Sequence, residues 1–252
     1  MAGRVDYRTA ASVYEQGRAL ATEDLEQWRR AIHAIVSPDF GTVLDLGAGT
    51  GIFTRAWRDW GARHVIACEP SGSMRAVSLQ HGSASNISIV AGRAEQIPLI
   101  AGTVDLVWLS TVVHHIGDLA AWGVETPRVL RVGGSLLIRN LFADLGDMGW
   151  MAEIPGAERV RQSYPTVTSI AEMLAVAGLE LVDTVEVSET NPNWSSASQA
   201  AAWIRMMRNA DSVLLSFSDE EIAVGLDRLE SYSEDHVLSQ LRGGLAVFRL
   251  VA

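Results

Sequence analysis

The segment Val43-Leu44-Asp45-Leu46-Gly47-Ala48-Gly49-Thr50-Gly51 decides the predicted fold of this 252-residue chain. A short apolar strand runs into three glycines, and the apolar spacing from Ile52 to Trp60 then indicates a helix. A glycine turn between a strand and a helix lets the backbone approach a ligand and aims N–H groups at an anionic group. The segment therefore predicts a binding loop at the end of a strand.

The spacing of these glycines separates two classes of ligand. It is Gly-x-Gly-x-Gly, and Ile52 stands where the dinucleotide fingerprint Gly-x-Gly-x-x-Gly needs its third glycine. A pyrophosphate cradle is therefore disfavoured, and a dinucleotide-dependent oxidoreductase with it. Glu69 follows the next apolar strand, so it is expected beside Asp45 at the carboxyl edge of the sheet, where it can accept both hydroxyls of a ribose.

Strands alternate with helices along the rest of the chain. Strands are predicted at residues 64–68, 87–90, 104–109, 135–142, 179–187 and 245–251. Helices are predicted at residues 7–36, 50–60, 71–80, 119–130 (ended by Gly133-Gly134) and 168–177, with a helical insertion near 196–232. This alternation indicates an α/β fold with a doubly wound, mostly parallel sheet that is buried on both faces.

Composition narrows the class of partner. The net charge is -10 and the pI is near 5.0, without a cluster of Lys and Arg, so nucleic acid is not an expected partner. No apolar run approaches the ~20 residues of a membrane helix. Cys68 is the single cysteine, which suits a reducing compartment. We expect a cytoplasmic protein that acts on a small molecule, either as a monomer or as a homodimer.

Several segments resemble class I, Rossmann-like S-adenosylmethionine-dependent methyltransferases. Residues 45–51 look like motif I of that family, and Glu69-Pro70-Ser71 with Met74 is similar to its acidic ribose-binding segment. Further resemblances, in family order, are Gly92-Arg93-Ala94-Glu95 to the adenine-flanking loop, 105–116 to the fourth strand and its turn, and 130–134 to the bend before strand five. Tyr7, Tyr14 and Arg18 are similar to an N-terminal helix that closes over the cofactor in small-molecule members. The sequence differs from the usual family pattern at Arg93, Pro127 and Arg131-Val132-Gly133.

The resemblance implies a seven-stranded sheet with an antiparallel last strand in a single domain. Residues 1–40 would form an N-terminal helical lid and 41–142 the cofactor-binding core. Residues 143–244 would form the substrate-side half, with a helical insertion at about 190–240 that makes a cap, and 245–252 the last strand.

The resemblance also assigns S-adenosylmethionine as cofactor and S-adenosylhomocysteine as product. Asp45 and the backbone of the loop would hold the methionine end, Glu69 the ribose, and Met74 with Ala94 the adenine, while Ser110 would lie near the sulfonium. The full set of cofactor-binding candidates is Asp45, Gly47, Ala48, Gly49, Thr50, Gly51, Glu69, Pro70, Met74, Ala94, Glu95, Ser110, Tyr14 and Arg18.

Methyl transfer from a sulfonium is an in-line displacement that depends mainly on alignment. A general base helps where the nucleophile loses a proton, and His115 and His114 are the candidates; the alternative is that they pack within the turn. Together with Asp118 they lack a fourth ligand at regular spacing, so no metal is expected.

The tryptophans and methionines of the second half suggest an apolar acceptor pocket. Trp150, Trp203 and Met207 are the candidates for its wall, with Trp122 and Trp194 also expected above the carboxyl edge; the alternative is a cap that buries its own apolar stripe. Arg205, Arg208 and Asp211 would either hold a polar end of the acceptor or form a solvated helix face.

The sequence therefore predicts methyl transfer to an O, N or C atom of a small molecule, in natural-product metabolism. The first alternative is a protein of the same fold that binds the cofactor without methyl transfer, either a non-methylating catalyst such as a cyclase or a partner subunit. A methyltransferase acting on RNA or protein is a further alternative, disfavoured for RNA by the low pI.

Overall fold

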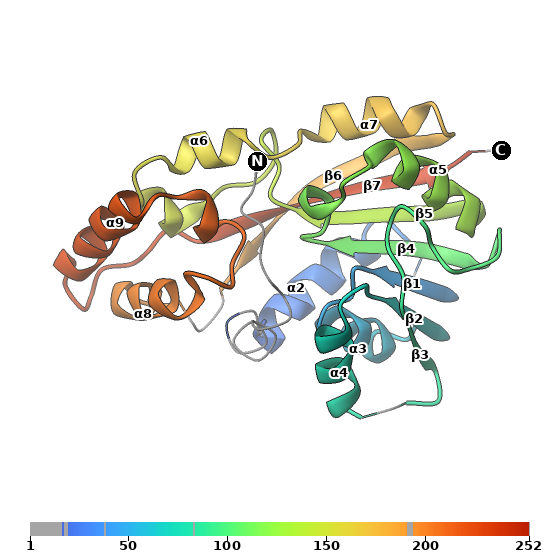
Figure 1. Ribbon diagram of the computed structural model, residues 1–252, viewed down its shortest axis with the longest axis horizontal. Coiled ribbons are helices and arrows are strands. Elements are labelled where there is room, and N and C mark those ends of the chain that lie inside the picture. Colours follow the sequence, from blue (N-terminus) through green and yellow to red (C-terminus); the bar gives the residue numbers. More distant parts are fainter. Residues whose placement is uncertain (1–16, 18–19, 38, 83, 191–193, 252) are drawn as a thin grey trace.

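A single seven-stranded sheet organises the chain (Figure 1). The computed structural model describes residues 17, 20–37, 39–82, 84–190 and 194–251. The strands are β1 (Thr42–Leu46), β2 (His64–Cys68), β3 (Ile87–Val90), β4 (Val104–Ser110), β5 (Leu130–Asn140), β6 (Leu179–Glu189) and β7 (Leu241–Leu250). Their order across the sheet is β3-β2-β1-β4-β5-β7-β6, and β7 runs antiparallel to both of its neighbours. The predicted fold class is confirmed, including the antiparallel last strand.

Helices cover both faces of this sheet (Figure 1). One face carries α2 (Thr22–His33), α3 (Ile52–Asp59) and α4 (Gly72–Gln80), and the other carries α5 (Leu119–Val129) and α7 (Val167–Ala175). On the first face, Trp28 of α2 and Trp57 of α3 are fully buried against the sheet. On the second face, Trp122 of α5 and Leu174 of α7 are equally buried. The parallel strands therefore lie between two apolar layers, as their composition predicts.

A group of helices at one end of the sheet forms a cap with an apolar core of its own (Figure 1). It contains α6 (Ala157–Gln162), α8 (Ala197–Met207) and α9 (Asp219–Ser231), with 3-10 turns at Gly149–Glu153 and Leu214–Ser216. The insertion before the last strand is helical, as predicted. Residues 148–164, for which the sequence pattern predicted no element, also join this core.

At two of the predicted boundaries that differ from the structure, glycines explain the difference. The helix before β5 ends at Val129, and the following residues already belong to the strand. A Cβ on Gly134 would lie 2.8 Å from the carbonyl oxygen of Arg131, so this glycine marks a close approach of backbones and not a helix end. β7 begins at Leu241 instead of 245, because Gly243 and Gly244 interrupt its apolar pattern.

The predicted helix at residues 7–36 is not continuous: Leu20 and Ala21 are not helical, and α2 runs only from Thr22 to His33. Residues 1–16, 18 and 19 lie outside the described residues. None of the helices in the described ranges is long and apolar enough to cross a membrane.

We expect Ser218→Ala to destabilise the cap. The Ser218 hydroxyl accepts from the backbone N–H of Glu221 at 3.1 Å, and the Glu221 carboxylate accepts from the backbone N–H of Ser218 at 2.8 Å. Loss of this capping box at the start of α9 should lower the free energy of unfolding by about 1 kcal/mol in urea denaturation. Ser231→Ala at the end of the same helix is the control, and equal stability of the two variants would contradict the expectation.

Candidate functional site

The glycine turn after β1 lies at the carboxyl edge of the sheet and is tied to the end of β2. The N–H groups of Gly47 and Ala48 donate to the carbonyl of Cys68 at 2.8 and 3.2 Å. Gly47 and Gly49 have φ values of +76° and +56°, in the left-handed region that glycine adopts without strain. A Cβ on Gly47 would lie 2.5 Å from Cγ2 of Val112, whereas a Cβ on Gly49 would enter open space. The turn therefore presents bare backbone to a cavity.

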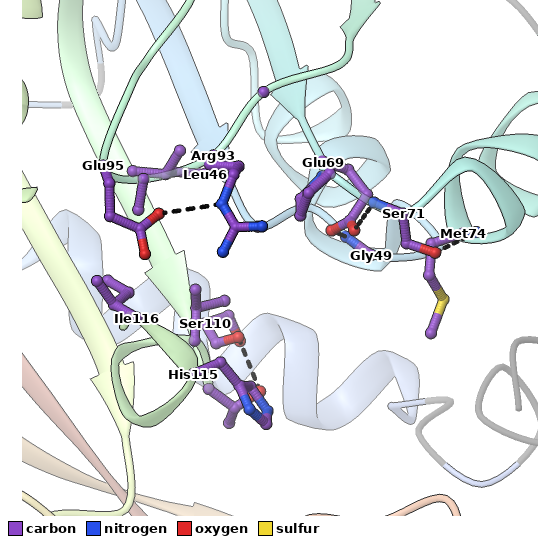
Figure 2. A pocket seen from close by; sticks show the side chains of 16 residues that line it. Leu46, Gly49, Glu69, Ser71, Met74, Arg93, Glu95, Ser110, His115 and Ile116 are labelled. Atoms are coloured by element: carbon purple, nitrogen blue, oxygen red, sulfur yellow. Dashed lines mark hydrogen bonds and ion pairs between the residues drawn. The ribbon is translucent and has the colours of Figure 1, made fainter. Parts of the chain in front are cut away.

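The first cavity lies beside this turn, between the ends of β1, β2 and β4 (Figure 2). It encloses about 790 Å³ of empty space, its open mouth included. Predicted cofactor residues that line it are Gly47, Gly49, Glu69, Pro70, Met74, Ala94, Glu95 and Ser110. The structure thus brings together side chains that the sequence places on four separate segments.

Glu69 is anchored at the wall of the first cavity. It is 8% exposed, and its two carboxylate oxygens accept separately from the N–H of Gly49 at 2.9 Å and of Ser71 at 2.7 Å (Figure 2). Burial raises the pKa of Glu69, while the two backbone N–H groups act in the opposite direction. Ser71 also caps α4 by accepting from the N–H of Met74 at 3.4 Å, and Met74 lines the same cavity.

The second cavity continues from the first on the α3 side of the glycine turn. Asp45, Gly47, Ala48, Gly49, Thr50 and Ser110 line it, together with Arg139, Glu189 and Trp194. Thr50 is 1% exposed, and its hydroxyl has no hydrogen-bond partner among the described residues. An orphaned hydroxyl at the end of a glycine turn fits a polar ligand group. Gly51 lines neither cavity and instead begins α3, where a Cβ would lie 2.5 Å from the Ser78 hydroxyl.

Asp45 is the most perturbed carboxyl of the site. It is 2% exposed, and the Thr54 hydroxyl donates to it at 2.6 Å. Burial raises the pKa of Asp45 to about 7, with a further contribution from the nearby charge of Glu69. A cationic ligand group in the second cavity would favour the ionised form, so this carboxyl suits an ammonium group.

The third cavity opens between the sheet and the cap. Its walls include Trp194, Trp203, Met148 and Met151 from the cap side and Asn140 from the end of β5. Thr111 lines all three cavities, and Arg139, Glu189 and Trp194 line both the second and the third. We call these four residues the threshold. Thr111 has a φ of +55°, which is uncommon for a residue with a branched Cβ, and its N–H donates to the carbonyl of Arg139 at 2.7 Å.

A buried ion pair forms the centre of the threshold. The guanidinium of Arg139 bonds the carboxylate of Glu189, and the two side chains are 9% and 4% exposed. Arg139 also donates to the Ser110 hydroxyl at 3.0 Å and lies 4.9 Å from the centroid of the Trp28 ring, while the Trp28 indole donates to Glu189 at 3.2 Å. The pair is therefore supported from α2, β4, β5 and β6.

The two candidate histidines divide between cavities. His115 lines the first cavity, whereas His114 lines the third, although their rings lie only 4.0 Å apart. Nε2 of His114 lies 3.0 Å from the Ser212 hydroxyl, and its ring lies 5.0 Å from that of Tyr164. Across the described part of the chain, no three His, Cys, Asp or Glu side chains are grouped to hold a metal ion.

The predicted acceptor residues do not all reach the third cavity. Trp203 lines it, but Trp150 and Met207 are not among its lining residues; they are buried in the cap core behind that wall, since Trp150 packs edge-on against Trp203 at 5.8 Å. Trp122 lies far from the cap, in the core beneath α5. Asp211 is 1% exposed and accepts from the N–H groups of Val213 and Leu214, so it belongs to a buried turn and not to a solvated face.

Arg205 and Arg208 pair with Glu230 and Asp219 within the cap. Tyr14 and Arg18 lie outside the described residues, so their predicted cofactor role stays a prediction.

Sequence reasoning missed three of the four threshold residues and gave Trp194 only a general place above the carboxyl edge. Arg139 carried a signal, because it is a charge that directly follows the apolar run Leu136-Leu137-Ile138 of its strand. Glu189 lies two residues beyond the predicted end of its strand, and its partner is fifty positions away. Nothing in the sequence marks Thr111 as left-handed.

Comparison with known proteins agrees with this geometry. Residues 44–138 match the family model described as a methyltransferase domain. A malonyl-acyl-carrier-protein O-methyltransferase of Serratia marcescens is 36% identical over 56% of this chain and 54% of that protein. The chain spans about half the length of the curated relatives it matches.

Two solved structures show the same fold over nearly the whole chain. A putative methyltransferase from an antibiotic biosynthesis pathway of Anabaena variabilis covers 89% of this chain and 96% of its own, with 18% identity and a TM-score of 0.71. A 4+2 cyclase covers 98% and 94%, with 17% identity and a TM-score of 0.66. Residues 44–138 therefore resemble a methyltransferase domain, and the chain shares the Rossmann-like fold of these solved structures.

The raised pKa of Asp45 predicts a pH dependence for the ligand-free protein. Since the folded pKa of about 7 exceeds the ordinary value of 3.8, the folded state holds an extra proton between them, and stability falls as pH rises through 7. The loss from pH 4 to pH 8 is on the order of 4 kcal/mol.

Asp45→Asn removes this titration and keeps an oxygen that can accept from Thr54. Urea denaturation from pH 4 to pH 8 should therefore show a smaller fall in stability for this variant than for the wild type. Glu69 is present in both proteins, so the difference between the curves reports the titration of Asp45 together with its coupling to Glu69. Parallel curves for the two proteins would contradict the assignment.

Proposed function

We propose that this chain transfers a methyl group from S-adenosylmethionine to a small-molecule acceptor. The observation that carries the proposal is Thr111, which lines all three cavities at once. A cofactor that occupied the first and second cavities would present its central atoms at this residue, and an acceptor in the third cavity would meet them there. Such an arrangement supplies the alignment on which an in-line displacement depends.

The residues of the first two cavities fit the proposed cofactor. Glu69 has further lone pairs for ribose hydroxyls, and Met74 and Ala94 offer an apolar slot for a base. In the second cavity, the Thr50 hydroxyl and the Asp45 carboxyl suit the carboxylate and ammonium of an amino acid. When bound, S-adenosylmethionine supplies an already activated methyl group. The chain's own residues then have to orient the reactants and exclude water.

The acceptor atom is proposed as O, N or C, in natural-product metabolism and in the cytoplasm. Similarity to a 27-O-demethylrifamycin SV methyltransferase and to a demethylmenaquinone methyltransferase supports a small-molecule acceptor. The cofactor-binding protein without methyl transfer is the alternative, and the likeness to a cyclase extends to the fold alone. S-adenosylmethionine that stays unconsumed with every acceptor tried would favour that alternative.

Cofactor binding is tested first by calorimetry with S-adenosylhomocysteine. Glu69→Gln should weaken binding at least tenfold, about 1.4 kcal/mol, because one ribose acceptor becomes an amide. Glu158→Gln, which removes a carboxylate from an exposed pair with Arg161, is the matched control and should bind like the wild type. No binding to the wild type would refute the proposed cofactor.

Placement in the third cavity makes His114 the better candidate for a general base. For a hydroxyl or amine acceptor, His114→Gln should lower kcat by about 100-fold or more and remove the acidic limb of its pH profile, with cofactor affinity unchanged. His115→Gln is the comparison and should affect cofactor binding more than kcat, because it lines the first cavity. The opposite ranking in steady-state kinetics would give the role to His115.

A further inference from the structure

Three of the four charged side chains that line the third cavity form ion pairs within the protein. Four charged side chains line it: Arg139, Glu189, Asp211 and Arg242. Arg139 and Glu189 neutralise each other across a buried contact. Arg242 contacts Asp147 at 3.5 Å and Glu186 at 3.0 Å on the half-exposed rim. Arg139, Glu189 and Arg242 therefore already have ionic partners within the protein, although Nε of Arg139 has no hydrogen-bond partner among the described residues.

Asp211 is satisfied in the same way, by backbone donors. Its Oδ1 accepts from the N–H of Val213 at 2.8 Å and of Leu214 at 3.0 Å, at the start of the 3-10 turn Leu214–Ser216. His114 and Tyr164 also line this cavity, and Nε2 of His114 lies 3.0 Å from the Ser212 hydroxyl.

The remaining wall includes the polar groups of Thr111, Asn140, Tyr164 and Ser212 and is otherwise apolar and aromatic. The rings of Trp194 and Trp203 meet edge to face, with centroids 5.0 Å apart, and both line the cavity. Met148, Met151 and Leu241 complete this side. Thioethers and indoles make favourable contacts with planar apolar molecules, and they do not replace the hydration that a charge would lose.

We propose that the third cavity takes an uncharged, largely apolar acceptor of aromatic type, and that the Arg139–Glu189 pair excludes charged ones. This inference rests on the proposed function, because it names the acceptor class for that site. An ammonium or a carboxylate group would lose its hydration on entering the cavity. The side chain of opposite charge that would attract it, Glu189 or Arg139, is already paired. An acceptor with a free carboxylate would have to displace Glu189 from Arg139, and Glu189 is held in addition by the Trp28 indole.

The test uses the full chain at pH 8 with S-adenosylhomocysteine bound and three probes of one shape. They are 4-methylphenol, 4-methylbenzoate and 4-methylbenzylammonium, titrated by ligand-observed NMR. The phenol should bind at least tenfold more tightly than either charged probe. A charged probe that binds as tightly as the phenol, or the absence of binding by all three, would overturn the inference. Saturation with S-adenosylhomocysteine is measured first, and its failure counts against the proposed function instead.

A variant tests the role assigned to the ion pair. Glu189→Gln leaves the guanidinium of Arg139 without its counterion, so 4-methylbenzoate should gain at least tenfold in affinity while 4-methylphenol changes little. Glu158→Gln is the control for loss of one carboxylate elsewhere and should leave all three affinities unchanged. An unchanged benzoate affinity in a folded Glu189→Gln protein would contradict the role. If this variant does not fold, the ranking of probes on the wild type decides the proposal.

Discussion

The hydrogen bonds that join the turn after β1 to the end of β2 are the constraint on which the site depends. The carbonyl of Cys68 accepts from two consecutive N–H groups of the turn, and the carboxylate of Glu69 accepts from a third, that of Gly49. These bonds require a backbone that folds back on itself, which the left-handed glycines permit. They also fix Glu69 against the cavity, so one local arrangement shapes the turn and positions an acidic side chain.

A second constraint connects this edge of the sheet with the cap. Arg139 on β5 and Glu189 on β6 meet across β7, which lies between them in the sheet. The meeting depends on Gly243 of β7, where a Cβ would lie 2.9 Å from the Trp28 ring and 3.3 Å from the Glu189 carboxylate. Buried pairs of this kind contribute little net stability, since desolvation offsets their attraction. In this protein the pair separates the second cavity from the third, and the left-handed Thr111 lies beside it.

Local sequence patterns predicted much of the fold and most of the residues that line the first two cavities. Strand, turn and helix follow each other within a few residues at Asp45 and at Glu69. Short sequence segments were therefore enough to predict both residues as ligand-binding. The threshold could not be predicted from the sequence, because Thr111, Arg139 and Glu189 lie in three separate segments that only the tertiary fold brings together. Trp150 and Met207 show the reverse case. Their apolar stripe indicated burial but could not say whether they face a cavity or the cap's own core.

The central claim is that three connected cavities align a cofactor and an acceptor at Thr111. A crystal structure with S-adenosylhomocysteine tests it most directly. The account predicts the ribose against Glu69, the base between Met74 and Ala94, and the sulfur facing Thr111 and the third cavity. S-adenosylhomocysteine bound elsewhere, or bound with its sulfur facing away from the third cavity, would contradict the account.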